Sequence, residues 1–215
     1  MIEKIEDYIR NPAVVDDFMN NCFYGTKSQR DRSEGAPRIT WMWEPHTTSD
    51  LFPQFSHVLL QRHYKRPDTG LFSDSPFWAF FKKIMKDFLK DNGIEHKRIT
   101  RANINCTYHF NHAHCGDPHV DYPNNHYTAI LYLNDVPGST YIFDKTASYK
   151  DLEEDSSKFI IPYQSIDWKN DPIPVKHEVK PQKGKMLLFD GSHYHAVCPT
   201  TPGHLRCIVV YNITY

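Results

Sequence analysis

The chain has 215 residues, the length of a single domain, and a chain of this length buries a sizeable core without disulfides or a structural metal. Its formal net charge is −1 at pH 7, so no strong field draws it to nucleic acid or to an anionic membrane. No stretch approaches the roughly eighteen consecutive apolar residues of a membrane span, and the polar first residues lack the apolar centre of a signal peptide. We therefore expect one cytoplasmic domain over 1–215 with no nucleic-acid or membrane partner; the sequence indicates no oligomeric state.

The cysteines are odd in number and show no CxxC spacing; they are Cys22, Cys106, Cys115, Cys198 and Cys207. A disulfide framework is typical of small secreted chains with an even number of cysteines. The pattern therefore predicts reduced thiols in a cytosolic protein.

The first part of the chain, 1–96, is predicted to be helical and irregular. Ser75 is a good N-cap. Apolar residues then recur at helical spacing, namely Phe77, Phe81, Ile84 and Phe88. Gly93 is a typical helix end. Two further helices are expected, at 2–20 and 50–64, and the aromatic stripe is expected to cover one face of a sheet.

From about residue 97 the hydrophobic period changes from helical to two. One face of the first predicted strand carries Thr100, Ala102, Ile104, Cys106, Tyr108 and Phe110. Further strands are predicted at 127–133, 139–143, 174–180, 185–190 and 204–214, with turn residues between them. Helices followed by many short strands predict an α+β protein whose core, 97–215, is a sandwich or jelly roll.

The segment 144–172 interrupts this rhythm and is interpreted as an insertion in the core. It carries seven acids against four lysines, a net charge of −3. Loops of this length inside a domain are usually lids, binding loops or disordered segments. We expect a substrate lid whose charge favours a neutral or cationic substrate; the alternative is a disordered surface insertion.

The motif that indicates chemistry is His119-Val120-Asp121. Residues two apart on a strand project from the same face, so this imidazole and this carboxylate converge on one point. His195 follows a predicted strand much later in the chain. Two imidazoles and a carboxylate on one face of an octahedral ion leave three positions open, as in Fe(II) oxygenases. His193 is the alternative third ligand because it lies two residues from His195 and shares its face. The His-x-Val-x-Pro pattern that begins at His195 favours His195.

An arginine and a tyrosine add an expected anion site to this metal site. Arg206 enters the final predicted strand, and a guanidinium there is able to form two hydrogen bonds with the distal carboxylate of a metal-bound dicarboxylic acid. Tyr132, one strand after the His-x-Asp motif, offers a phenol to the same anion. The alternative for Tyr132 is a core aromatic without ligand contact.

Together these motifs resemble the prolyl 4-hydroxylase-like family of non-haem Fe(II), 2-oxoglutarate-dependent dioxygenases. The segments that carry the resemblance lie within about residues 100–215, in the family's order, and are Pro118-His119-Val120-Asp121, Tyr132-Leu133-Asn134, Leu187-Leu188-Phe189, His195-Ala196-Val197-Cys198-Pro199 and Arg206. The resemblance implies a double-stranded β-helix (jelly-roll) core buttressed by N-terminal helices. It also implies iron ligands and 2-oxoglutarate contacts, which are His119, Asp121 and His195 for iron and Arg206, Tyr132 and Tyr108 for 2-oxoglutarate.

The implied activity is hydroxylation of a C–H bond with Fe(II), 2-oxoglutarate and O2, with release of succinate and CO2; ascorbate is a candidate requirement. Since relatives that chlorinate carry a small residue in place of Asp121, the carboxylate implies hydroxylation. A peptidyl proline is the family's usual substrate, and relatives also act on free amino acids, so we expect a peptide or small-molecule partner. Two alternatives are a cupin-like metalloenzyme that does not use 2-oxoglutarate and a non-catalytic jelly-roll binding module.

Overall fold

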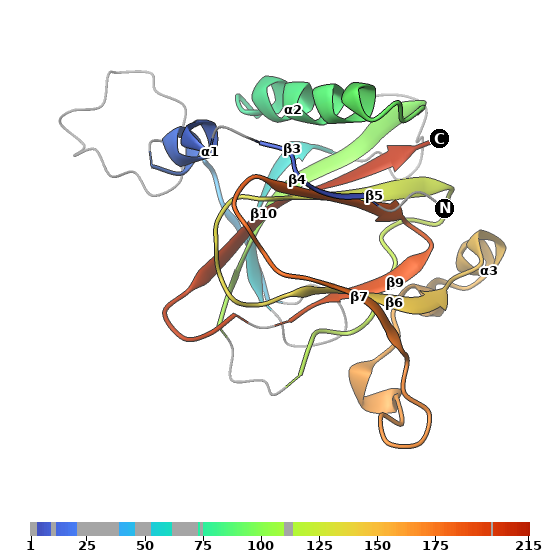
Figure 1. The fold of residues 1–215 in the computed structure, drawn as a ribbon. Helices are drawn as coiled ribbons and strands as arrows, with labels where there is room; N and C mark the ends of the chain where they lie inside the picture. The colour runs from blue at the N-terminus through green and yellow to red at the C-terminus, as the bar shows by residue number, and fades with distance from the viewer. Residues whose placement is uncertain are drawn as a thin grey trace.

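The computed structural model consists of two antiparallel sheets that face each other (Figure 1). It describes residues 4–9, 12–20, 39–45, 53–61, 73, 75–109, 114–198 and 200–215. Within this part of the chain the larger sheet has the strand order β1 (Lys4–Asp7), β8 (Lys185–Asp190), β5 (His126–Tyr132), β10 (Leu205–Thr214), β4 (Arg98–Tyr108), β3 (Gln54–Leu60) and β2 (Met42–Glu44). The smaller sheet has the order β7 (Val175–Val179), β6 (Thr140–Thr146) and β9 (His193–Val197).

The larger sheet has two different faces because alternate residues of a strand point to opposite sides. On its outer face, Ala102, Ile104 and Cys106 of β4 belong to the main hydrophobic core. The helix α2 (Trp78–Asp91) covers this face (Figure 1). The opposite face packs toward the smaller sheet, where Tyr132 of β5 and Ile142 of β6 share a second hydrophobic cluster. The expected strands of the core and the expected helix that carries the aromatic stripe are therefore present. The prediction of an α+β jelly roll is confirmed.

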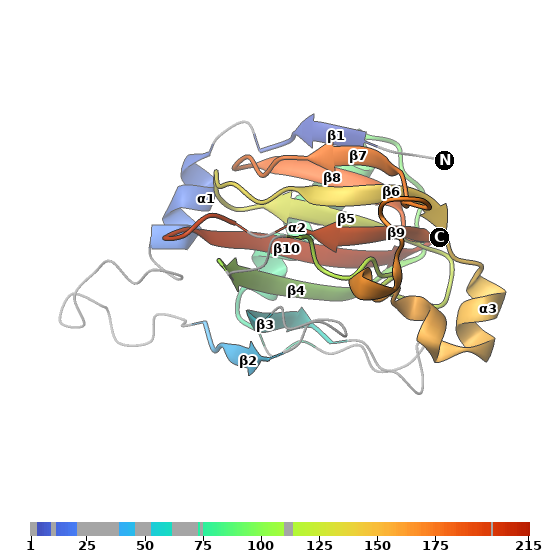
Figure 2. The ribbon, with the colours of Figure 1, turned by 90° about the horizontal axis from the view of Figure 1, so that it is seen from below.

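The N-terminal part differs from its predicted helices. The range 2–20 contains β1 and the short helix α1 (Ala13–Phe18). Within 50–64 the structure describes a strand, β3, so the prediction of a helix there was wrong. Its residues pair with β4 along Gln54 to Leu60, because the hydrogen-bonding edge of β4 outweighs local helix preference. Figure 2 shows β3 and β2 extending one edge of the larger sheet. None of the described helices is long and apolar enough to cross a membrane.

The insertion is folded over the residues that precede β5. It contains α3 (Tyr149–Glu154) and two 3-10 helices, η2 (Ser156–Phe159) and η3 (Tyr163–Ser165). The Val120 amide donates to the Phe159 carbonyl at 2.9 Å, and the Ile161 amide donates to the Pro118 carbonyl at 2.8 Å. These bonds join the insertion to the His-x-Asp segment, so a disordered surface insertion is not what the structure describes.

The cysteines also differ from the prediction of reduced thiols. Cys115 and Cys198 form a disulfide across 83 positions of sequence, with their Cα atoms 4.0 Å apart. The chain brings them together because the Gly116 amide donates to the Val197 carbonyl beside them. Cys106 and Cys207 are free and buried; Cys22 lies outside the described residues. No spacing rule reveals a bridge between such distant positions.

The packing of α2 on the sheet predicts a measurable difference between two phenylalanines of that helix. Phe88 is 0% exposed and its ring contacts the ring of Tyr8, whereas Phe80 is 37% exposed. Phe88→Ala should lower the free energy of unfolding by about 3–5 kcal/mol, and Phe80→Ala by less than about 1.5 kcal/mol. Urea denaturation of both variants measures the two values, and equal losses would contradict this placement of α2.

Candidate metal and anion site

The structure brings the three predicted metal ligands together. His119 and His195 exchange two backbone hydrogen bonds, at 2.9 and 3.0 Å, although they lie in distant parts of the sequence. Asp121 lies two residues beyond His119, and its Oδ2 is 3.7 Å from His195 Nε2. The candidate ligand atoms of the three residues all lie within 4.8 Å of one another. The pairing of β9 with the His-x-Asp segment is therefore what assembles this cluster.

The backbone around each histidine sets its tautomer. His119 Nδ1 lies 3.0 Å from the Asp117 carbonyl, and His195 Nδ1 lies 3.3 Å from the His193 carbonyl. A carbonyl only accepts, so each Nδ1 carries the proton and donates it, and each Nε2 keeps its lone pair. Burial and the neighbouring His119 lower the pKa of His195 to about 4, although Asp121 opposes the shift. Both imidazoles thus present Nε2 as the ligand atom, and the lowered pKa keeps His195 neutral near pH 7.

Asp121 is held as a carboxylate by its neighbours. Burial alone would raise the pKa of its carboxyl, but His195, Arg101, His119 and an amide from Asn212 together lower the pKa well below its usual range. Oδ2 accepts hydrogen bonds from Asn212 Nδ2 at 3.0 Å and Thr128 Oγ1 at 3.3 Å. Oδ1 lies 3.4 Å from Arg101 NH1. These contacts orient the carboxylate toward the two imidazoles.

His193, the competing histidine, has a different environment. Its Nδ1 donates to the Phe143 carbonyl at 3.0 Å and its Nε2 lies 3.5 Å from Lys176 Nζ. It is buried, but it does not line the cavity that contains His195. Of the two histidines, only His195 lies with the His-x-Asp pair.

A buried guanidinium lies in the same cavity. Arg206 is 2% exposed; its Nε donates to the Gly138 carbonyl at 3.1 Å and its NH2 to Thr140 Oγ1 at 2.6 Å. Among the residues that the structure describes, no carboxylate pairs with it. Tyr132 donates its hydroxyl to Thr140 Oγ1 at 2.8 Å, and the Arg206 guanidinium lies 5.6 Å from the centre of its ring. A buried charge without a counter-ion is costly, so this position fits an anionic ligand.

The cavity around these groups has a volume of about 270 Å³. It contains the metal cluster and Arg206, and its further polar side chains are Gln54, Arg101, Asn105, Thr107 and Thr140. These five residues are absent from the site predicted from the sequence. The period-two pattern of β4 was a usable signal for three of them, because Arg101, Asn105 and Thr107 occupy the face opposite to its apolar residues. Asn105 Oδ1 is buried and has no hydrogen-bond partner among the described residues, as expected of an atom that faces a ligand.

Tyr108, the third residue implied for 2-oxoglutarate, is not brought to this cavity. Its side chain is 41% exposed and its ring contacts Phe55. The physical reason is the strand period: Thr107 pairs with Arg206 in the ladder and lines the cavity, so the next residue points to the opposite face. Tyr132 reaches Arg206 by way of Thr140 and is not part of the lining.

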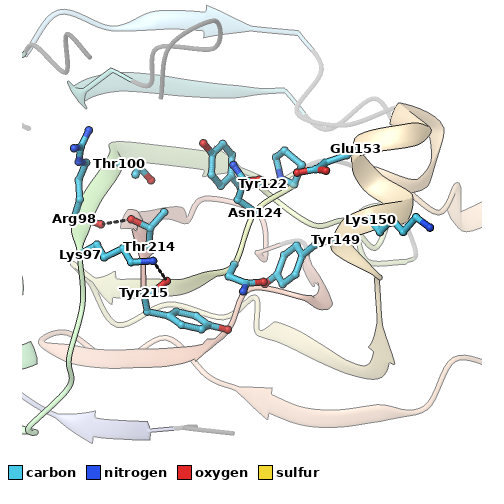
Figure 3. Close-up of a pocket in the computed structure, with 12 residues that line it drawn as sticks. Lys97, Arg98, Thr100, Tyr122, Asn124, Tyr149, Lys150, Glu153, Thr214 and Tyr215 are labelled. Carbon is cyan, nitrogen blue, oxygen red and sulfur yellow. Dashed lines mark hydrogen bonds between the residues drawn. The ribbon is translucent and has the colours of Figure 1, made fainter. Parts of the chain in front are cut away.

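A second pocket, of about 560 Å³, lies at the end of β4 and β10 (Figure 3). Lys97, Arg98, Thr214 and Tyr215 come from the strand ends, and α3 contributes Tyr149, Lys150 and Glu153. It shares no lining residue with the cavity above and contains none of the three clustered metal ligands. The cavity of about 270 Å³, which contains the three clustered ligands and Arg206, is therefore the candidate functional site.

Comparisons with known proteins agree with this geometry. The 2OG-Fe(II) oxygenase superfamily model, in which 2OG is 2-oxoglutarate, matches residues 103–214, just over half of the chain. No curated protein matches this chain. Among solved structures, an oxidoreductase of the 2OG-Fe(II) oxygenase family from Burkholderia pseudomallei has a TM-score of 0.55 and 14% identity, covering 82% of this chain and 74% of its own.

Two further structures have the same fold. A Pseudomonas putida prolyl-4-hydroxylase has a TM-score of 0.50 and 12% identity, covering 99% of this chain and 92% of its own. The epimerase SnoN in complex with Fe3+, alpha-ketoglutarate and nogalamycin RO has a TM-score of 0.57 and 9% identity, covering 99% and 78%. At these identities the likeness supports the double-stranded β-helix fold alone. The family match carries the assignment: this chain belongs to the 2OG-Fe(II) oxygenase superfamily.

Proposed function

We propose that this chain binds Fe(II) through His119, Asp121 and His195, binds 2-oxoglutarate through Arg206, and hydroxylates a C–H bond of its substrate with release of succinate and CO2. The observation that carries the proposal is the buried Arg206 guanidinium, which has no described counter-ion and shares one cavity with the three clustered ligands. A metal site and an anion site in one small cavity suit a co-substrate that binds both.

The donor set fits the metal. Two imidazole Nε2 atoms and one carboxylate on one side of an ion form the facial arrangement of non-haem Fe(II) oxygenases, with the other positions open. When bound, Fe(II) and 2-oxoglutarate supply the oxidising chemistry with O2. The chain orients the ligands through the Asp117 and His193 carbonyls and through Asn212 and Thr128.

The anion site fits a dicarboxylate. Arg206 is fixed by Gly138 and Thr140, so its planar guanidinium is already ordered before a carboxylate arrives. The Thr107 hydroxyl lies in the same cavity and is able to donate a further hydrogen bond to the anion. A metalloenzyme that does not use 2-oxoglutarate gives Arg206 no role, and a non-catalytic module has little need of the three clustered ligands.

The insertion is proposed to close the cavity over the substrate. Phe159 and Ile160 are the residues of the insertion that line the cavity, and they lie beside His119. Their side chains are apolar, so they exclude water and contact an aliphatic group. The acids of the insertion are absent from the lining, which removes the reason to expect a neutral or cationic substrate. The name of the P. putida enzyme makes a prolyl residue one candidate.

Substitution of each ligand tests the metal site. His119→Ala, Asp121→Ala and His195→Ala should each abolish succinate release and strongly weaken Fe(II) binding, because each removes a donor from a three-residue site. Anaerobic Fe(II) titration and a succinate assay with ascorbate measure both properties. His193→Ala is the matched control and should keep most of both; an active His195→Ala beside an inactive His193→Ala would contradict the assignment.

Substitution of Arg206 tests the anion site. The loss of a buried charge pair costs about 2–5 kcal/mol, roughly 30- to 5,000-fold in affinity. Arg206→Ala should therefore raise the 2-oxoglutarate KM at least tenfold while Fe(II) binding survives. Tyr132→Phe should have a smaller effect, since it removes one neutral hydroxyl near Arg206 and leaves the guanidinium charge in place. If the KM of Arg206→Ala equals that of the wild type, the co-substrate anchor is another residue.

Substitution in the insertion tests the lid. Phe159→Ala should lower substrate-stimulated succinate release much more than the slow release without substrate, because a lid acts on coupled turnover. Ile166→Ala is the control, since it lies in the same insertion but does not line the cavity. Both rates are measured with a panel of proline-containing peptides and free amino acids. Equal loss of the two rates in Phe159→Ala would show that the residue supports the metal site and not the substrate.

A further inference from the structure

Arg101 is a cavity residue whose role the proposed function does not explain. It lies on the inner face of β4, beside Asn212 of β10 in the ladder. Its NH1 is 3.4 Å from Asp121 Oδ1, a long contact for a charge-assisted hydrogen bond. With the Asn103 amide nitrogen donating to the Ala102 carbonyl, the Asn103 oxygen accepts from Arg101 NH2 at 3.3 Å. The side chain lines the cavity and remains 27% exposed, so the guanidinium, which has five N–H donors, is accessible to a ligand.

The charges of the cavity do not balance. Its ionised lining side chains, among the described residues, are Arg101, Arg206 and Asp121, two cations against one anion. On the proposed function, the two positive charges of Fe(II) and the two negative charges of 2-oxoglutarate cancel. One positive charge therefore remains in the loaded cavity. Iron also shares the negative charge of Asp121, which leaves Arg101 beside a dication with a weakened counter-ion.

The remaining lining restricts the size and polarity of what completes the site. Phe159, Ile160 and Val120 present an apolar wall, while Gln54 and Asn105 are polar and uncharged. The whole cavity, about 270 Å³, lies just below the usual range of about 300–1,000 Å³ for small-molecule sites and has to hold 2-oxoglutarate as well. A folded segment of another protein is too large to enter; a molecule the size of an amino acid fits.

We infer that the substrate is a small aliphatic carboxylic or amino acid whose carboxylate binds Arg101 and whose hydrocarbon part lies against Phe159 and Ile160. A planar guanidinium with free donors is the preferred partner of a carboxylate. Binding of such an acid neutralises the remaining charge and places its carbon chain between the metal cluster and the insertion. This inference rests on the proposed function, because the charge balance counts Fe(II) and 2-oxoglutarate.

Binding measurements on an inert form of the protein test the inference without turnover. The full chain is loaded with Zn(II), which takes the same nitrogen and oxygen ligands without redox chemistry, and with 2-oxoglutarate. Calorimetry then compares acids with their amides: pentanoate with pentanamide, L-leucine with L-leucinamide, and L-proline with L-prolinamide. Acids should bind at least tenfold more tightly than their amides, as expected for one hydrogen-bonded charge.

Three variants and one spectroscopic signal locate the effect. Arg101→Gln should abolish the preference for acids, and Arg101→Lys should keep part of it. Arg98→Gln removes a cation from the same strand outside the cavity and should keep all of it. In the wild type, the acids should shift the Arg101 Nε–H resonance in NMR spectra, a measurement that does not depend on the folding of a variant. No preference for acids, a preference that survives in Arg101→Gln, or an unmoved Arg101 resonance would each overturn the inference.

Failure of the proposed function gives a different result. Substrate-free succinate release by the Fe(II)-loaded wild type, absent from His119→Ala, measures that function independently of the acid–amide pairs. A chain that prefers acids through Arg101 but never converts 2-oxoglutarate keeps the carboxylate site and loses the proposed function. A chain that converts 2-oxoglutarate but binds acids and amides equally keeps the function and loses this inference.

Discussion

The two-residue period of β4 and β10 is the constraint on which the rest of the molecule depends. In both strands, one set of side chains enters the core under α2 and the other set enters the cavity, so a single pair of strands builds stability and chemistry together. Cys106 and Val209 belong to the first set, while Thr107, Arg206 and Ile208 belong to the second. A shift of one residue in this pairing would exchange the two sets and place the Arg206 charge under an aromatic helix.

Charge in this protein is distributed unevenly between the two ends of the cavity. Asp121 has several donors directed at it, whereas Arg206 has only neutral acceptors among the described residues. A fold selected for stability alone would pair that guanidinium with a carboxylate or replace it with an apolar side chain. The core between the sheets therefore gives up stability at Arg206, and the large outer core around α2 compensates for it.

The sequence predicted most of the jelly roll and the metal cluster because both depend on short-range patterns. Alternation marked the strands, and the His-x-Asp spacing placed two ligands on one side of the chain before any tertiary information was needed. Tyr108 was assigned to the cavity from its position in a motif, but the phase of the same strand points it outward. The β3 strand and the Cys115–Cys198 bridge depend on partners far away in sequence, which no local pattern encodes. Arg101 was visible as an inward residue of β4, yet its contact with Asp121 depends on how the segment before β5 folds back.

The position of His119 links the insertion mechanically to the metal cluster. His119 bridges Ile160 on one side and His195 on the other, so the backbones of the insertion, the His-x-Asp segment and β9 lie side by side with His119 in the middle. Residues 159–161 are unable to move away as a block without pulling on the backbone that positions His119. Substrate exchange and metal retention would then oppose each other, unless the moving part is confined to the flanks of the insertion. A change in residues 159–161 thus reaches the backbone of His119 directly, and through His119 it reaches the backbone of β9.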